Sequence, residues 1–201
     1  MAAEDAERIV GLYDRHAAAF DQQRGRNLFE RAWLDRFLGV VCSGGAVLDV
    51  GCGMGEPIAR YIIERGYDVT GVDSSPNMIR LCTARFPEQT WLTADMRQLS
   101  LYRQFDGILA WDSLFHLTLY DQRAMFPMFG RHAAEHAALM FTSGPQFDER
   151  IGVFEGEPLY HASLDPDEYR ALLAANGFEA VAYVAEDKSC GGHTVWLAQR
   201  V

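Results

Sequence analysis

The first 41 residues alternate apolar and polar positions with a helical period. Within residues 4–20, apolar side chains recur every three or four positions and include Tyr13 and Phe20, which predicts an amphipathic helix. Residues 28–41 repeat the same pattern. We therefore expect residues 1–41 to form a helical lid ahead of the rest of the chain.

The pattern then changes to short apolar runs that alternate with amphipathic segments. Short runs rich in branched apolar residues are typical of buried strands. The predicted strands cover residues 46–50, 68–72, 90–93, 105–110, 138–141, 180–185 and 193–198. The predicted helices between them cover residues 57–65, 76–86, 120–132 and 166–175. The last helix stops at Asn176-Gly177, a pair that readily adopts the left-handed conformation of a helix end.

Strands and helices that alternate at this spacing form βα units around a mainly parallel sheet. No helix separates the last two predicted strands, so we expect them to pair antiparallel. The sequence thus predicts an α/β fold: a Rossmann-like, seven-stranded, mostly parallel sheet with helices on both faces, an antiparallel last strand and an N-terminal helical cap. Because no linker or repeat interrupts the chain, residues 1–201 are expected to form a single domain.

Charge and cysteine content narrow the class of function. The chain has 18 Lys and Arg, 28 Asp and Glu and a net charge of −10 at pH 7. Such a field repels polyanions, so nucleic acid is not expected as a partner. The N-terminus lacks the pattern of a signal peptide, and no apolar run reaches the length of a bilayer. The four cysteines are scattered and no metal-ligand cluster is evident, which favours a cytoplasmic protein with reduced thiols and no metal.

The sequence VLDVGCGMGEP, residues 47–57, follows the first predicted strand with three alternating glycines. In the dinucleotide-binding pattern G-x-G-x-x-G, Gly51 and Gly53 match the first two glycines, but Glu56 occupies the third. Beside Pro57, which suits the first turn of a helix, the Glu56 carboxylate would occupy the positive helix end that a pyrophosphate needs. No Gly-Lys-Ser/Thr of a P-loop follows. The loop therefore favours a ligand with an uncharged or cationic middle.

VLDVGCGMG resembles the first motif of class I S-adenosylmethionine-dependent methyltransferases. Further along, VTGVDSSPNMI resembles their second-strand motif and TADMRQL the segment after their third strand. FDGILAWDSLFHL resembles the fourth strand and its exit, and GFEAV with GGHTVWLAQ resembles the terminal antiparallel pair. The resemblance runs from about residue 46 to the C-terminus. It implies a small, single-domain enzyme of bacterial type that uses S-adenosylmethionine and releases S-adenosylhomocysteine.

The resemblance also implies where the cofactor binds. The residues expected to contact it are Asp49, Gly51, Cys52, Gly53, Asp73, Ser74, Met78, Asp95, Met96, Arg97 and Trp111. Asp73 follows Gly51 by 22 residues, near the spacing of an acid that binds the ribose hydroxyls. The alternative is that Asp73 caps the helix beginning near Pro76. Asp95 similarly either meets the adenine or caps its own loop.

Asp49 lies inside an apolar strand, where a carboxylate needs a partner. Loop amides or the ammonium group of a ligand could supply it, and the resemblance places Asp49 beside the methionine part of the cofactor. Cys52 and Met54 suit packing better than a role as nucleophile. Trp111 ends the fourth predicted strand, where its ring either faces the methyl donor or belongs to the core.

The exit from the fourth strand, WDSLFHL, bears on the methyl acceptor. It lacks the D/N-P-P-aromatic sequence of nucleobase and glutamine amino methyltransferases, and the chain has no Pro-Cys pair of a cytosine-C5 enzyme. These absences and the negative charge favour a small-molecule acceptor. His116 is a candidate catalytic base, unless Asp112, one helical turn earlier, satisfies it. Asp112 is the other catalytic candidate, or else a helix cap.

Residues 144–165 form a long segment at the edge of the sheet where ligands bind. We interpret it as a substrate flap, with an ordered surface loop as the alternative. Tyr160 and His161 are candidate substrate contacts, but in extended chain they point to opposite faces, so at most one reaches the pocket. Tyr13 and Phe20 are further substrate candidates, or simply the core face of their helix.

The leading hypothesis is a methyltransferase that transfers the methyl group of S-adenosylmethionine to an unidentified small molecule, as a monomer or homodimer. One competing hypothesis is an NAD(P)-dependent oxidoreductase, against which Glu56 and the antiparallel strand argue. The other is a non-catalytic S-adenosylmethionine-binding regulatory protein. A general base is needed only if the attacked atom carries a proton that must leave, so the sequence leaves the nature of that atom open.

Overall fold

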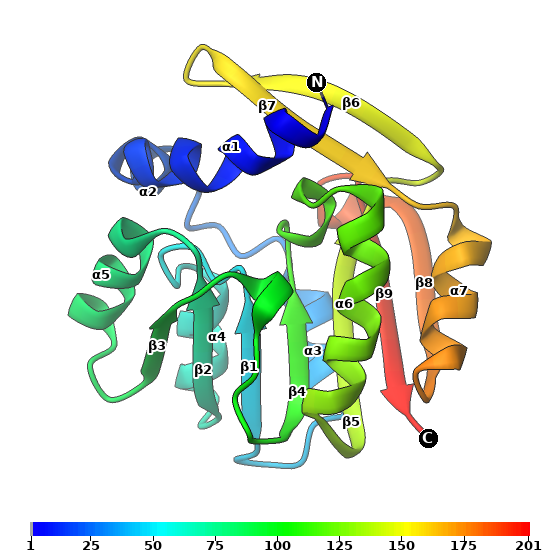
Figure 1. Cartoon of the computed structure of the whole chain (residues 1–201). Helices are drawn as coiled ribbons and strands as arrows, with labels where there is room; N and C mark the ends of the chain where they lie inside the picture. The colour runs from blue at the N-terminus through cyan, green and yellow to red at the C-terminus, as the bar shows by residue number, and fades with distance from the viewer. Residues whose placement is uncertain (1) are drawn as a thin grey trace.

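The computed structural model describes residues 2–201, with side chains from residue 6 onward. At its centre is a seven-stranded sheet in the order β3-β2-β1-β4-β5-β9-β8 (Figure 1). Its strands are β3 (Thr90–Thr93), β2 (Asp68–Asp73), β1 (Ala46–Val50), β4 (Phe105–Ala110), β5 (Ala133–Ser143), β9 (His193–Arg200) and β8 (Phe178–Asp187). Only β9 runs antiparallel to its neighbours β5 and β8; the other pairs are parallel. The predicted mostly parallel sheet with an antiparallel end is confirmed.

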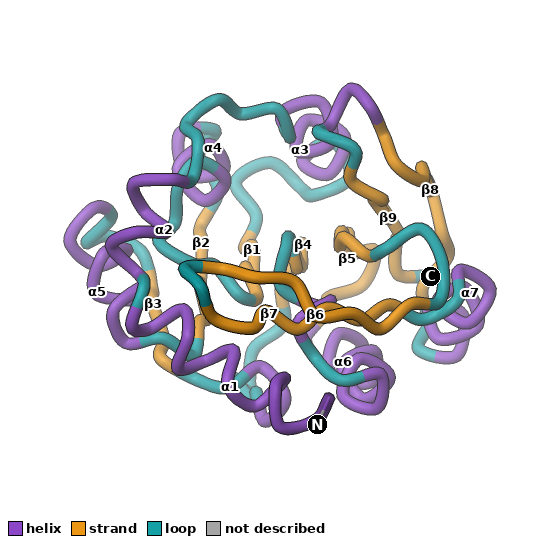
Figure 2. Tube along the Cα trace, turned by 90° about the horizontal axis from the view of Figure 1, so that it is seen from above, coloured by secondary structure: helices purple, strands orange, loops and turns teal. Residues whose placement is uncertain are grey.

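Helices cover both faces of the sheet (Figure 2). They are α3 (Arg31–Leu38) and α4 (Ile58–Glu64) on one face, α6 (Leu119–His132) and α7 (Pro166–Ala175) on the other, and α5 (Pro76–Arg85) beside β2 and β3. Within residues 2–201, no helix has the length and apolar character needed to cross a membrane. The predicted helices on both faces are confirmed.

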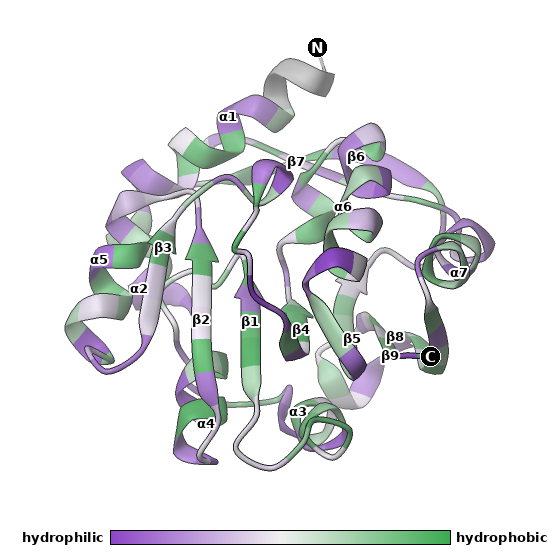
Figure 3. Cartoon of the chain, turned by 60° about the horizontal axis from the view of Figure 1, so that its bottom comes forward, coloured by the Kyte–Doolittle hydropathy of each residue, from purple (hydrophilic) through white to green (hydrophobic). Residues whose placement is uncertain are grey.

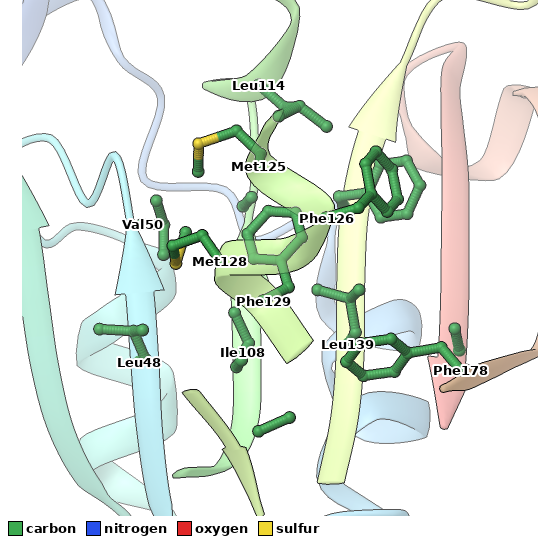
Figure 4. Packing of buried hydrophobic residues seen from close by; sticks show 14 of the residues in the cluster. Leu48, Val50, Ile108, Leu114, Met125, Phe126, Met128, Phe129, Leu139 and Phe178 are labelled. Atoms are coloured by element: carbon green, nitrogen blue, oxygen red, sulfur yellow. The ribbon is translucent and has the colours of Figure 1, made fainter. Parts of the chain in front are cut away.

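The central strands are apolar on both sides, which explains their continuous hydrophobic runs. Consecutive strand residues point to opposite faces: Val47 packs with α3 and α4, whereas Leu48 packs with α6 and α7. Figure 4 shows Leu48 and Ile108 in the latter cluster, near Phe129 of α6. Figure 3 shows β1 and β4 coloured mainly as hydrophobic. Full burial of each such large side chain stabilises the fold by roughly 1.5–3 kcal/mol.

Two N-terminal helices lie above the carboxyl ends of the strands (Figures 1 and 2). They are α1 (Ala2–Arg15) and α2 (Ala17–Gln23). His16 leaves the helical conformation, with φ −104° and ψ 19°, so the helix predicted over residues 4–20 is interrupted there. The backbone hydrogen bonds from His16 to Leu12 and from Phe20 to His16 continue across this point, so the two helices follow each other directly.

Residues 144–165 contain a hairpin that the sequence did not predict. Its strands β6 (Asp148–Phe154) and β7 (Glu157–Ser163) pair antiparallel, apart from the main sheet. Glu155 and Gly156 connect them, both with positive φ, as a two-residue hairpin turn requires.

The hairpin and α1 form one cover over the edge of the sheet. Ile9 and Leu12 of α1 pack against Tyr160 of β7 in a small buried cluster. Glu157 pairs with Arg15 at 2.5 Å and with His16 at 2.7 Å. We name this unit, residues 2–23 with residues 148–163, the cover.

Candidate cofactor and substrate site

The glycine loop begins a tight turn directly after β1, where the strand order reverses between β1 and β4. Gly51 has a φ of +79°, in the left-handed region that favours glycine. A Cβ added there would lie 2.3 Å from the Cβ of Ser113. The amides of Gly51 and Cys52 both donate to the Val72 carbonyl, at 2.7 and 3.1 Å. The loop is therefore fixed between the end of β2 and the exit from β4.

Asp73 is the last residue of β2 and faces the glycine loop. Its carboxylate accepts one hydrogen bond from the Gly53 amide at 2.9 Å and another from the Ser75 amide at 2.8 Å. Burial raises its pKa, although these amides act in the opposite direction. The cap of α5 is Ser75, whose Oγ accepts from the Met78 amide at 3.1 Å. Each oxygen of Asp73 keeps a lone pair for a further donor.

Asp49 is buried in β1 with 3% of its surface exposed. Within residues 6–201, no group donates a hydrogen bond to its carboxylate. Burial, followed by the charge of Asp73, raises its pKa to about 7. A buried carboxylate without a donor is costly, so a cationic ligand group bound here would offset that cost.

Asp95 begins the short 3₁₀ turn η1 (Met96–Gln98) that follows β3. Its Oδ1 accepts from the Arg97 amide at 2.9 Å, and its Oδ2 lies 2.6 Å from the Arg97 guanidinium. Burial opposes ionisation, but the bonds from Arg97 lower the pKa of Asp95 overall. Asp95 thus caps its own loop, as one of the two interpretations of the sequence expected. It also lines the cavity.

These elements enclose a cavity of about 340 Å³, within the size range of small-molecule sites. The predicted residues that line it are Tyr13, Phe20, Asp49, Gly51, Cys52, Gly53, Asp73, Ser74, Met78, Asp95, Met96, Arg97, Trp111, Asp112, His116 and His161. Tyr160 lies outside it, fully buried in the cover, where its hydroxyl donates to Glu149 at 2.8 Å. The structure therefore brings together every predicted site residue except Tyr160.

His116 ends the short turn η2 (Leu114–His116) and is 7% exposed. Its Nδ1 lies 2.9 Å from the Tyr160 carbonyl oxygen, and its Nε2 lies 3.1 Å from the Tyr13 hydroxyl. A carbonyl can only accept, so Nδ1 carries the proton and Nε2 accepts from Tyr13. Burial lowers the pKa of His116 to about 4, which makes the ring neutral at pH 7. Its partners are Tyr13 and Tyr160, rather than Asp112 as the alternative interpretation supposed.

Asp112 is paired with His193, the first residue of β9. Nε2 of His193 lies 3.1 Å from Oδ1 of Asp112, and its Nδ1 lies 2.8 Å from the Cys190 carbonyl oxygen. Both nitrogens donate only in the imidazolium form, and the hydrogen bond to Asp112 raises the pKa of His193. Ser113, rather than Asp112, precedes η2 as its cap residue. Asp112 therefore faces the cavity as half of an ion pair.

Several lining residues had no predicted role, among them His193, Ser113, Phe115 and Asp121. His193 could have been found from the antiparallel direction of β9. Because β9 runs opposite to β5, its first residues lie at the carboxyl end of β5, where Thr194 pairs with Ser143.

The strand order, the glycine loop, the acid within β1 and the acid that ends β2 match the Rossmann-like fold of class I methyltransferases. Residues 47–136 match the family of methyltransferase domains. In this segment and in its fold the chain is similar to the class I S-adenosylmethionine-dependent methyltransferases.

Known proteins that resemble the chain are methyltransferases. The magnesium-protoporphyrin O-methyltransferase of Rhodobacter capsulatus is 31% identical over 129 residues, 62% of this chain and 55% of that protein. The chain spans about half the length of the curated relatives it matches.

Solved structures show the same fold over nearly the whole chain. The CcbJ methyltransferase from Streptomyces caelestis has a TM-score of 0.75 at 15% identity, covering 94% of this chain and 97% of that one. The 1,6-didemethyltoxoflavin-N1-methyltransferase of Burkholderia thailandensis has a TM-score of 0.73 at 19% identity, covering 100% and 91%.

Proposed function

We propose that the protein transfers the methyl group of S-adenosylmethionine to a small molecule. The observation that carries this proposal is Asp49, a buried carboxylate beside the glycine loop that no donor within residues 6–201 satisfies. The ammonium group of the methionine moiety would supply the missing partner. The Burkholderia thailandensis relative was crystallised with S-adenosylhomocysteine and its acceptor, which supports the same use of this fold here.

The remaining lining residues fit the other parts of the cofactor. The free lone pairs of Asp73 suit the two ribose hydroxyls. Met96 and Met78 offer apolar walls for the adenine, and Asp95 lies where an exocyclic amine could donate to it. When bound, the cofactor supplies an electrophilic methyl group on a cationic sulfur.

The chain contributes position, exclusion of water and one proton path. The cover closes the cavity from above, which holds donor and acceptor together and keeps water out. The Tyr13 hydroxyl donates a hydrogen bond to Nε2 of neutral His116. When an acceptor donates a proton to the Tyr13 oxygen, the Tyr13 proton can pass to His116. The pair thus serves as a general base without a charged residue at the reacting atom.

The volume of the cavity and the net charge of the protein favour a small-molecule acceptor. The cavity of about 340 Å³ also has to hold the cofactor, and the net charge of −10 opposes nucleic acid. All four cysteines are free thiols, which suits the cytoplasm. We propose a cytoplasmic enzyme that acts as a monomer or homodimer.

Thermal-shift and calorimetric titrations test the cofactor. S-adenosylhomocysteine should bind with micromolar affinity and raise the midpoint of unfolding, because a ligand of the folded state stabilises it. NAD⁺ and NADH should leave that midpoint unchanged. Stabilisation by NAD(H) and not by S-adenosylhomocysteine would contradict the proposal. Binding without formation of S-adenosylhomocysteine across a broad acceptor panel would instead favour a regulatory protein.

A further inference from the structure

A second cavity adjoins the first at the carboxyl end of β5. It measures about 390 Å³ and lies between the ends of β5 and β9 and the hairpin. The two cavities share Asp112, Phe115, His161 and His193. A ligand that reaches the methyl-transfer cavity at these four residues can therefore extend into the second one.

Asp112 is held at this junction by its pairing with His193, whose Nε2 lies 3.1 Å from Oδ1 of Asp112. The ring of His193 stacks against Trp111 at 5.5 Å and lies 5.4 Å from the ring of Phe29, and aromatic faces favour its cationic form. The Asp112 amide donates to Thr142 Oγ1 at 2.9 Å. Its side chain stays 36% exposed, and a carboxylate offers about four lone-pair positions. Asp112 therefore retains acceptor capacity toward the cavities.

The arginines that line the two cavities are each paired with an acid. Arg24 binds the buried Glu30, and Arg97 binds Asp95 at 2.6 Å. Arg150, which pairs across the hairpin with His161, lies 3.8 Å from Asp148 in the lining of the second cavity. Among the described residues of both linings, these arginines and His193 are the cations, and all four have acidic partners. An anionic acceptor would thus meet carboxylates without a free guanidinium.

We propose that the methyl acceptor is an amine whose nitrogen binds Asp112 and whose remaining part occupies the second cavity. This inference rests on the proposed methyltransferase function. Asp112 holds the ammonium form of the acceptor, while His193 orients the Asp112 carboxylate from 3.1 Å. His193 is a positioning residue, since both of its nitrogens are already bonded.

For an amine acceptor, His161 takes the proton that leaves the ammonium before attack, and the Tyr13–His116 pair takes the proton that leaves the methylated nitrogen afterwards. Nδ1 of His161 lies 3.2 Å from the Leu159 carbonyl oxygen, so Nε2 carries the lone pair. Its ring stacks on Phe115 at 5.3 Å, and burial lowers its pKa. The ammonium gives one proton to Nε2. The freed nitrogen lone pair then forms the N–CH₃ bond as the S–CH₃ bond breaks, and that electron pair stays on sulfur.

The test compares two probes of similar shape and opposite charge, tyramine and 3-(4-hydroxyphenyl)propionate, by calorimetry on the complex with S-adenosylhomocysteine. Tyramine should bind at least about tenfold more tightly, the scale of one charge-assisted hydrogen bond. Asp112→Asn should abolish that preference. Asp35→Asn removes the same charge from an exposed position on α3 and should preserve it.

The affinity for S-adenosylhomocysteine, measured first, separates the two proposals. If the wild-type protein does not bind S-adenosylhomocysteine, the proposed methyltransferase function itself is wrong. If S-adenosylhomocysteine binds but tyramine is not preferred, or neither probe binds, only the proposal of an amine acceptor is wrong. A preference that survives in Asp112→Asn would overturn it as well.

Discussion

The hydroxyl of Tyr13 lies 3.1 Å from Nε2 of His116, although the two residues are 103 positions apart in the chain. Nδ1 of the same ring is held by the Tyr160 carbonyl oxygen at 2.9 Å. His116 therefore receives one partner from α1 and one from the hairpin, the two parts of the cover. Lifting the cover would remove both hydrogen bonds at once, so the closed cover and the neutral, oriented histidine depend on each other.

Tyr13→Phe should slow methyl transfer by roughly a hundredfold, the lower range of general acid–base contributions. The ring and its packing remain, while the oxygen that accepts the acceptor's proton is lost. The affinity for S-adenosylhomocysteine should stay within about twofold, because the methionine and ribose contacts lie elsewhere. Turnover is measured with the acceptor that the wild type methylates fastest. His116→Ala should show the same pattern.

Tyr120→Phe is the matched control for Tyr13→Phe. Tyr120 lies 78% exposed on α6, so removal of its hydroxyl should leave turnover unchanged. Full activity of both Tyr13→Phe and His116→Ala would show that the base is another group or that none is required.

Asp73→Ala should weaken binding of S-adenosylhomocysteine by more than about tenfold, since charge-assisted hydrogen bonds to the ribose would be lost. Asp68→Ala serves as the control at the opposite end of β2. Its carboxylate is half exposed and pairs with Arg103 at the surface, so the cofactor affinity should not change. Equal affinities of Asp73→Ala and the wild type in calorimetry would remove Asp73 from the site.

Gly51→Ala should destabilise the fold more than Gly66→Ala does. Both glycines have positive φ, +79° and +85°, so alanine costs about 1 kcal/mol at either position through the backbone. Around Gly66 nothing lies within 4 Å of the added Cβ, whereas at Gly51 it would lie 2.3 Å from the Cβ of Ser113. The clash should add a further cost of about 1–3 kcal/mol.

Urea unfolding of the two variants measures this difference. Gly51→Ala should also weaken S-adenosylhomocysteine binding, because the loop must shift away from Ser113, while Gly66→Ala should bind normally. Equal stability losses at the two positions would show that the loop yields without cost.

The sheet could be predicted because its strands are buried on both faces and leave continuous apolar runs in the sequence. The hairpin could not. The strand β6 is largely exposed and begins with Asp148, Glu149 and Arg150. Its apolar part, residues 151–154, is too short to indicate a strand by itself. Its partner β7 is held by contacts with α1, such as Tyr160 with Leu12. Those contacts are tertiary and have no local signature.

The position of Asp49 and Asp73 in the cavity lining could also be predicted from the sequence, because β1 and β2 carry these acids next to the glycine loop. The acceptor side did not, since its pairs arise from register and from the cover. Asp112 meets His193 only because β9 pairs with β5 in one particular antiparallel register. Sequence spacing suggested Asp112 as the partner of His116, whereas the 3₁₀ turn and the cover give His116 other partners.

Acid should destabilise the protein partly through His116. Its pKa is lowered from 6.5 to about 4 in the folded chain, so between these values the unfolded state binds more protons. Stability rises with pH wherever that holds. The contribution is therefore complete above pH 6.5 and is lost as the pH falls toward 4. A shift of this size corresponds to about 3 kcal/mol.

Comparison of the wild type with His116→Gln isolates this effect. Urea unfolding at pH 7 and pH 4 should show that the wild type loses about 3 kcal/mol more than His116→Gln over that range. Asp49 has a raised pKa, so its contribution to stability changes with pH in the opposite direction. This contribution is the same in the wild type and in His116→Gln and cancels in the comparison. His136→Gln replaces an exposed histidine on β5 and should retain the full acid sensitivity of the wild type. If His116→Gln also retains it, the ring of His116 is protonated in the folded chain, and it cannot then accept the proton of Tyr13.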